Sequence, residues 1–301
     1  MDPVTAPQWL YPAAAKLWSR WLPESSLATL RTNGFYSYWS GSKPTDWGVI
    51  ALNSCLWMTG NKPTENLTDG DPGDQFAYLE QELIAAQSRG QKAYLLAHCP
   101  PSALEMQLLF NTRWSELLRK YHTSLEAGFY GHDHLDFLRI VYDKPGYRSS
   151  NAKAVGVGYV SPSGTTRPGG PMGGHNPAFR IFHRMNEQSV QLASHETYWC
   201  DLAKANRDGK VVFEKEYSTA DDQPLESLRV PSPLTAQGWD DLVNRVNTED
   251  EATQMYWRLT SVQAVEPNTT CNTACKKELL CLARYGCDSV IALGHCFISG
   301  L

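Results

Sequence analysis

The sequence predicts an α/β fold followed by a helical, cysteine-rich lobe. Short apolar strands alternate with amphipathic helices up to about residue 205, which is typical of a sheet covered by helices. Beyond that point helical periodicity dominates, and five of the eight cysteines lie in the last stretch of the 301-residue chain. These observations predict one domain over 1–205 and a second over 206–301.

Seven segments of the first domain have the apolar runs or the alternation that are typical of strands. In chain order they are 47–52, 93–97, 127–130, 137–142, 155–160, 179–183 and 190–197. The last two are expected to pair and to close the sheet. The connection at 161–177 is rich in glycine, proline, serine and threonine, and we expect either a mobile loop or a loop that lines a site.

Helices are expected where apolar residues recur three and four positions apart. The first is an aromatic run that ends at Pro23, and the second runs from Asp74 to a glycine stop at Gly90. A third carries Trp114 and Tyr121 on one face. In the second domain the pattern returns at 239–246, 251–259 and 276–285. This second domain is predicted to be a helical lobe stapled by disulfides.

Charge and hydropathy exclude two classes of interaction. Lys and Arg number 27 against 32 Asp and Glu, so the net charge is −5 and no basic stripe is available for a nucleic acid. No apolar run approaches the ~20 residues that a bilayer-spanning helix needs. We therefore expect no nucleic-acid partner and no transmembrane segment.

The cysteines and two glycosylation sequons indicate an oxidising compartment. The sequons begin at Asn66 and Asn268. The late cysteines favour disulfides over zinc, because they contain no paired C-x-x-C arms and have only His295 nearby. Residues 1–7 lack the basic and apolar regions of a signal peptide. We therefore expect a secreted glycoprotein whose reading frame has lost its own N-terminus.

Three histidines that follow predicted strands are the sharpest chemical feature. His98 follows the strand at 93–97, and His132 and His134 lie two residues apart after the strand at 127–130. Ligands gather beyond the carboxyl ends of strands in an open α/β sheet, and imidazole is a common zinc ligand. One histidine in such a place is more often a hydrogen-bonded structural residue, but the three together predict a metal site.

The histidines belong to two longer motifs, His-Cys-Pro-Pro at 98–101 and Gly-His-Asp-His at 131–134. Further motifs are Trp-Leu-Tyr at 9–11, Asn-Pro-Ala-Phe-Arg at 176–180 and His-Glu-Thr-Tyr at 195–198. Together these segments resemble the acid sphingomyelinase family of calcineurin-like metallophosphoesterases, in which the two histidine motifs supply metal ligands. The resemblance extends over nearly the whole chain.

The resemblance implies the C-terminal half of a metallophosphoesterase β-sandwich with flanking helices, followed by the family's helical disulfide-rich lobe. It implies hydrolysis of sphingomyelin to ceramide and phosphocholine at a two-zinc centre, with a phospholipid substrate at a membrane surface. His98 and His132 would serve one zinc, and His134 the other. The resemblance also implies a disulfide between Cys271 and Cys275 and a secreted or lysosomal location.

Three of the family's motifs are absent from the sequence. We find no Asp-x-His, no bridging aspartate after a second strand, and no Gly-Asn-His, whose histidine protonates the leaving group. The catalytic acid is therefore unknown in this chain and is expected upstream of Met1. We expect partial zinc binding at most, and a truncated chain with impaired turnover.

Several alternatives remain open at this point. The chain could be a non-catalytic secreted remnant or binding module, a fragmentary gene model, or a phosphodiesterase that acts on nucleotides. Cys99 is expected to be structural or paired with Cys55, and a metal role for its thiol ranks behind these. The pairing of the other cysteines is not predicted, since eight cysteines allow 105 connectivities.

Overall fold

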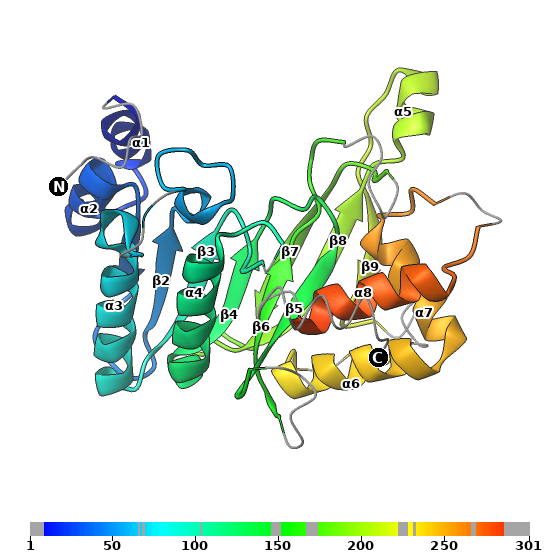
Figure 1. Ribbon diagram of the computed structural model, residues 1–301. Helices are drawn as coiled ribbons and strands as arrows, with labels where there is room; N and C mark the ends of the chain where they lie inside the picture. Colours follow the sequence, from blue (N-terminus) through cyan, green and yellow to red (C-terminus); the bar gives the residue numbers. More distant parts are fainter. Residues whose placement is uncertain are drawn as a thin grey trace.

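The computed structural model describes residues 9–65, 67, 70–102, 104–145, 152–166, 174–221, 228–230, 233–265 and 269–285. Within these residues the chain forms a mixed α/β structure of eight α-helices and two β-sheets, one with six strands and one with three (Figure 1). None of the helices in this part of the chain is long and apolar enough to cross a membrane.

The six-stranded sheet has the order β1-β2-β3-β4-β6-β5. Its strands are β1 (Tyr36–Trp39), β2 (Trp47–Leu52), β3 (Lys92–Ala97), β4 (Leu125–Tyr130), β5 (Phe137–Tyr142) and β6 (Ala154–Val160). The central strands run parallel to one another in the order β2, β3, β4 and β6. The edge strand β1 pairs antiparallel with β2, and the edge strand β5 pairs antiparallel with β6. β6 lies between β4 and β5 although it follows both in the chain. The parallel core places the carboxyl ends of β2, β3 and β4 at one edge.

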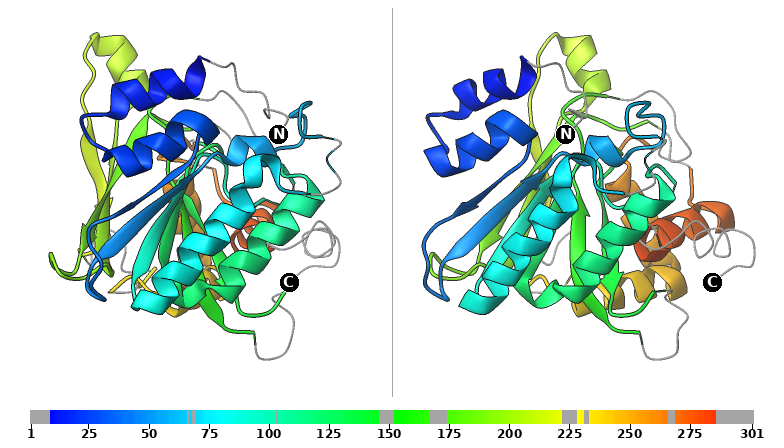
Figure 2. Two further views of the ribbon diagram at one scale, coloured as in Figure 1. Left: turned by 90° about the vertical axis from the view of Figure 1, so that its left-hand side faces the viewer. Right: turned by 60° about the vertical axis from the view of Figure 1, so that its left-hand side comes forward.

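Helices α3 (Gln75–Arg89) and α4 (Leu108–Lys120) cover one face of this sheet (Figure 2). Their apolar stripes bury aromatic rings against it: Trp57 stacks on Phe76 at a centroid distance of 4.3 Å and meets Trp114 edge-on at 4.7 Å. Gly90 ends α3 in the left-handed conformation at φ 66°, where a side chain would be strained.

The three-stranded sheet and the late helices cover the opposite face. The small sheet pairs β7 (Ala178–Arg184) with β8 (Leu192–Trp199) and β8 with β9 (Glu214–Ser218), both antiparallel. Phe182 contacts Phe129 and Tyr159 of the large sheet at centroid distances of 4.7 and 5.0 Å. Helices α6 (Ala236–Thr248), α7 (Asp250–Thr260) and α8 (Thr273–Tyr285) join the same core.

A charged network is enclosed where the small sheet meets this core. The Asp136 carboxylate accepts hydrogen bonds from Arg180, from Thr197 at 3.1 Å and from Tyr217 at 2.9 Å. The Arg180 side chain is only 2% exposed. Its charge is therefore balanced by a carboxylate that three side chains hold in place.

The start of the described chain forms a helical pair rather than the single helix predicted up to Pro23. α1 (Leu10–Trp18) and α2 (Glu24–Asn33) lie on either side of that proline and pack through Ala15, Leu27 and Leu30. Proline is favoured at helix starts, which explains why it precedes a helix here. α5 (Leu202–Asp208) is a short further helix that the sequence did not predict.

The predicted strands are all present, with bounds that shift by one to two residues in most cases. The last two pair with each other as expected, but they form a second sheet with β9, so the expectation that they close the large sheet was wrong. β1 and β9 were not predicted. The prediction of a lobe boundary at residue 205 stays a prediction; β9, which follows it, pairs with β8. Cys271 and Cys275 form a disulfide with Cα atoms 5.3 Å apart, the pairing that the family resemblance implies. Asn66 and Asn268, the acceptor residues of the two predicted sequons, lie outside the described residues.

Candidate metal centre

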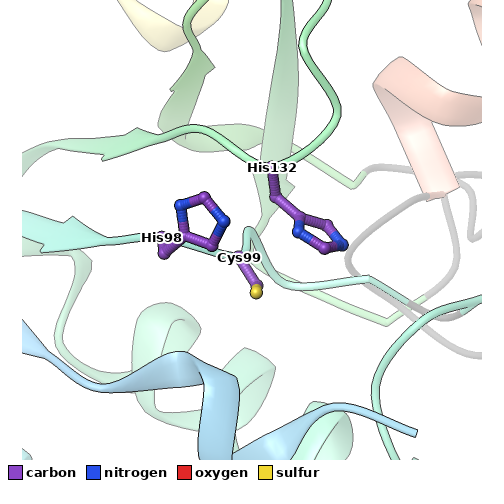
Figure 3. A group of neighbouring side chains, drawn as sticks. All are labelled: His98, Cys99 and His132. Carbon is purple, nitrogen blue, oxygen red and sulfur yellow. The ribbon is translucent and has the colours of Figure 1, made fainter. Parts of the chain in front are cut away.

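Two of the predicted histidines meet at the carboxyl edge of the large sheet. His98 follows β3, and His132 lies in the loop after β4, the parallel neighbour of β3. Their ring centroids are 5.3 Å apart and the ring planes are inclined by 82° (Figure 3). The topology thus brings together side chains that lie 34 positions apart in the sequence.

Backbone contacts fix the loop that carries His132. The N–H of Gly131 donates a 2.8 Å hydrogen bond to the carbonyl of His98, and the N–H of Ser161 donates one of 2.8 Å to Tyr130. His132 and His134 adopt left-handed backbone conformations, with φ of 71° and 62°. Such values are uncommon outside glycine, and histidine is among the residues that tolerate them. The loop is therefore held in a specific turn by its neighbours.

The first donor group consists of His98, Cys99 and His132. One ligand atom from each of them lies within 4.8 Å of the other two. Figure 3 shows the three side chains as neighbours on the two loops. Two imidazole nitrogens and a sulfur form a donor set that suits zinc. Burial and the neighbouring His132 lower the pKa of His98, which favours the neutral imidazole that metal binding requires.

A second donor group, Glu105, His132 and Asp133, shares one histidine with the first. A carboxylate oxygen of Glu105 lies 3.7 Å from Nε2 of His132. The Asp133 carboxylate also accepts a 3.2 Å hydrogen bond from the buried guanidinium of Arg139. These are the two groups of three such donors found in the described part of the chain, and they surround the same imidazole.

His134 lies on the same loop but faces a different neighbour. Its ring centroid is 5.5 Å from that of His175, with an interplanar angle of 76°. His134 belongs to neither donor group. The structure therefore brings His98 and His132 together and places His134 beside His175; the role of His134 as a ligand of a second ion stays a prediction.

A second thiol adjoins the first donor group. Sγ of Cys55 lies 3.9 Å from Sγ of Cys99, and the N–H of Cys99 donates a 2.8 Å hydrogen bond to Oγ of Ser54. The thiol–thiol hydrogen bond lowers the pKa of Cys55 to about 7 and raises that of Cys99. Cys55 is exposed whereas Cys99 is buried.

Sequence reasoning missed the carboxylates of this centre. Asp133 stands between two predicted ligands, so its position in the motif could have marked it. Glu105 had no such signal, because its approach depends on the loop after β3 folding back: the N–H of Thr59 donates a 2.8 Å hydrogen bond to the carbonyl of Glu105. Cys99 was adjacent to a predicted ligand but was assigned first to structure or to Cys55.

Comparison with known proteins gives a consistent set of relatives, although no protein-family profile matches the chain. The chain is 30% identical to human acid sphingomyelinase-like phosphodiesterase 3b over 282 residues, which are 91% of the chain and 59% of that protein. It is 30% identical to human sphingomyelin phosphodiesterase over 283 residues, 91% of the chain and 41% of the relative. Human cyclic GMP-AMP phosphodiesterase SMPDL3A is 28% identical over 280 residues, 90% and 58% respectively.

The chain spans about half the length of the curated relatives that it matches. The similarity nevertheless extends over about nine tenths of the chain and includes proteins that carry the same family name. These relatives agree with the family that the two histidine motifs indicate. The chain is therefore a homologue of the acid sphingomyelinase-like phosphodiesterases, at about 30% identity over about 91% of its length.

Proposed function

We propose that this chain carries part of a metal-dependent phosphodiesterase centre in which His98 and His132 hold a zinc ion. The observation that carries the proposal is the 5.3 Å approach of these two rings from the ends of neighbouring parallel strands. The relatives support the reaction class, because their names describe phosphodiesterases. Two sheets that share a core with flanking helices are compatible with half of a metallophosphoesterase sandwich.

The residues of the site have separable tasks in this proposal. A zinc ion, when bound, would polarise a phosphoryl oxygen and acidify a water molecule. His98 and His132 bind as neutral imidazoles, and the hydrogen bond from Gly131 to His98 keeps their loops in register. Arg139 orients the Asp133 carboxylate next to His132. His134 is proposed to serve a second ion.

The first substrate class that we propose is the phosphodiester of sphingomyelin at a membrane surface, cleaved to ceramide and phosphocholine. The relatives named sphingomyelin phosphodiesterase support it. A second candidate is a nucleotide phosphodiester, which is favoured by the relatives named cyclic GMP-AMP phosphodiesterase. Whichever substrate it takes, we propose that the protein is a glycoprotein that is secreted or located in the lysosome.

The donor inventory predicts modest activity for these 301 residues by themselves. Among the described residues the two donor groups share His132, so they provide one well-supported position for an ion rather than two. A phosphodiesterase of this type uses a pair of ions to stabilise the attacking and leaving oxygens. We therefore propose low turnover for this chain, with metal-dependent binding without turnover as the alternative.

Zinc affinity and hydrolysis, measured on the same preparation, test the proposal. Affinity is determined by competition with a chromogenic chelator, and turnover with sphingomyelin, cyclic GMP-AMP and a chromogenic phosphodiester at acidic and neutral pH. We expect His132→Ala to weaken zinc binding by about tenfold or more and to remove any turnover. His183→Ala, which alters a half-exposed histidine on β7, is the matched control. Equal zinc affinity in both variants would reject the proposed centre, and binding without turnover would favour the non-catalytic alternative.

A further inference from the structure

The sulfur of Cys99 lies between two sets of partners that it cannot serve at once. Sγ of Cys99 and one ring nitrogen from each of His98 and His132 all lie within 4.8 Å of one another. The same sulfur lies 3.9 Å from Sγ of Cys55. A sulfur in a disulfide is no longer a thiolate, which is the form that binds metals. We propose that Cys99 is a ligand of the cation held by the two histidines, and that disulfide formation with Cys55 withdraws it. This inference rests on the proposed function, since it requires a cation at His98 and His132.

The donor set favours a thiolate ligand at this position. Two imidazoles and one thiolate make three protein ligands, the number that catalytic zinc sites use while a fourth position stays open. The side chain of Cys99 is 1% exposed, so water does not compete for it in the way that it would for a surface thiol. Loss of Cys99 would leave this group with two imidazoles, which bind zinc less tightly than three ligands do.

The local backbone is arranged so that the two sulfurs can join. Cys55 lies in the 3₁₀ turn Ser54–Trp57 that follows β2, and Cys99 follows β3, the parallel neighbour of β2. The 2.8 Å hydrogen bond from the N–H of Cys99 to Ser54 holds these two ends together. The sulfurs need to approach by about 1.9 Å to reach the bond length of a disulfide. Rotation of two short side chains can supply this movement.

Their unequal exposure gives the oxidation an order. Cys55 is exposed, so its thiolate attacks one sulfur of a small disulfide such as glutathione disulfide and releases the first glutathione thiolate. The Cys99 thiolate then attacks the Cys55 sulfur of the mixed disulfide and releases the second. Two protein thiols lose two protons and two electrons in total, and one glutathione disulfide is reduced to two glutathione thiols. Reduction by a thiol runs the same steps backwards and returns Cys99 to the cation.

The experiment compares reduced and glutathione-oxidised forms of the 301-residue chain and of three serine variants. Cys55→Ser removes the disulfide partner and keeps the proposed ligand, whereas Cys99→Ser removes the ligand. Cys200→Ser, at another buried free cysteine, is the matched control for the loss of a buried thiol. Three quantities are measured: the Cys55–Cys99 linkage by non-reducing peptide mapping, zinc affinity by chelator competition, and the thiolate-to-cobalt charge-transfer band of the Co²⁺-substituted protein. Circular dichroism establishes that each variant is folded.

We expect the reduced chain, the reduced Cys200→Ser variant and Cys55→Ser in both redox states to bind zinc equally and to show the cobalt band. The oxidised chain and Cys99→Ser should lose the band and bind zinc about tenfold or more weakly. A linked chain that keeps its affinity and its band, or the absence of the linkage in the folded chain, would overturn the proposal. The His132→Ala variant distinguishes a failure of the proposed role of Cys99 from a failure of the proposed metal centre. If that variant loses zinc while oxidation and Cys99→Ser have no effect, the centre stands and only the role of Cys99 is wrong; if it keeps zinc, the centre itself fails.

Discussion

The backbone N–H of Gly131 donates a 2.8 Å hydrogen bond to the carbonyl oxygen of His98. This contact joins the loop after β4 to the loop after β3 immediately beside the two imidazoles. A hydrogen bond between main-chain groups does not depend on side-chain rotamers, so it holds the relative position of the loops before any ligand arrives. The separation of His98 and His132 is therefore set by the fold.

Substitutions at Gly131 test whether this position limits the metal centre. A Cβ at this position would lie 3.6 Å from Nδ1 of His98, which is ordinary van der Waals contact, so Gly131→Ala should retain the fold and the site. Gly131→Leu adds three further carbons in the same direction and should displace the His98 ring, weakening zinc binding by about tenfold. Chelator competition gives the affinities. Similar affinities for the alanine and leucine variants would contradict this account.

Removal of the Asp136 carboxylate should destabilise the protein strongly. Arg180 is buried and donates to Asp136, as do Thr197 and Tyr217, so Asp136→Ala leaves a buried cation without its counter-charge. We expect a loss of about 3–5 kcal/mol in the free energy of unfolding, measured by urea denaturation. Glu24→Ala, which breaks the exposed pair with Arg31, should cost under about 1 kcal/mol. Comparable losses for the two variants would show that the buried network contributes no more to the free energy of unfolding than an exposed ion pair does.

Glu216 should make stability fall as the pH rises. Burial raises the pKa of its carboxyl group to about 8, against hydrogen bonding from Gln263 and the charge of Arg180, which lower it. The folded state therefore holds a proton that the unfolded chain releases near its ordinary pKa of ~4.3. The stabilising contribution is complete below that value and is lost as the pH approaches 8, with a slope of up to about 1.4 kcal/mol per pH unit.

The measurement for Glu216 is urea denaturation of the unsubstituted chain and of Glu216→Gln at pH 5, 6.5 and 8. The neutral amide cannot ionise, so its advantage over glutamate should grow from pH 5 to pH 8. Other titrating groups are common to both proteins and cancel in the difference. A constant difference between the two proteins across this range would exclude the shifted pKa.

The disulfide between Cys271 and Cys275 should stabilise the chain by a modest amount. It closes a loop with a sequence separation of 4, and the chain-entropy estimate for so short a loop is about 2 kcal/mol. The double variant Cys271→Ser with Cys275→Ser should lower the free energy of unfolding by this amount. Cys281 is disulfide-bonded as well, so a thiol reductant should destabilise both proteins. It should destabilise the unsubstituted chain by about 2 kcal/mol more than the double variant, which already lacks the Cys271–Cys275 bond.

The fold could be predicted where a segment carries its own signal. Both ends of β5 were predicted correctly, since Phe137–Tyr142 is apolar apart from Arg139 and is buried along its whole length. α3 was predicted because an amphipathic run stops at Gly90. β9 was missed for the converse reason. Glu214–Ser218 begins with three charged residues at the edge of the small sheet, so its strand conformation depends on pairing with β8 rather than on its own composition.

The candidate site shows the same division. The approach of His98 and His132 followed from two strands that end in histidine motifs and the rule that parallel neighbours end at one edge. The position of Glu105 did not, because it depends on an antiparallel bridge between Met58 and Met106 that joins two loops. The local sequence predicts which residues lie at the end of a strand, whereas contacts between loops depend on the assembled tertiary structure.

The interposition of β6 between β4 and β5 has a consequence for the order of folding. β5 and β6 are consecutive in the chain and antiparallel, so they can pair early. The loop that carries His132 connects β4 to β5 and therefore has to cross over the end of β6, which lies between these two strands in the sheet. The loop from β4 to β5 cannot adopt its final conformation until β6 of the β5–β6 hairpin has paired with β4. We therefore expect the amide protons of β4 and β6 to gain protection from hydrogen exchange before the imidazoles become competent to bind a cation. Metal capture would then report the completion of folding.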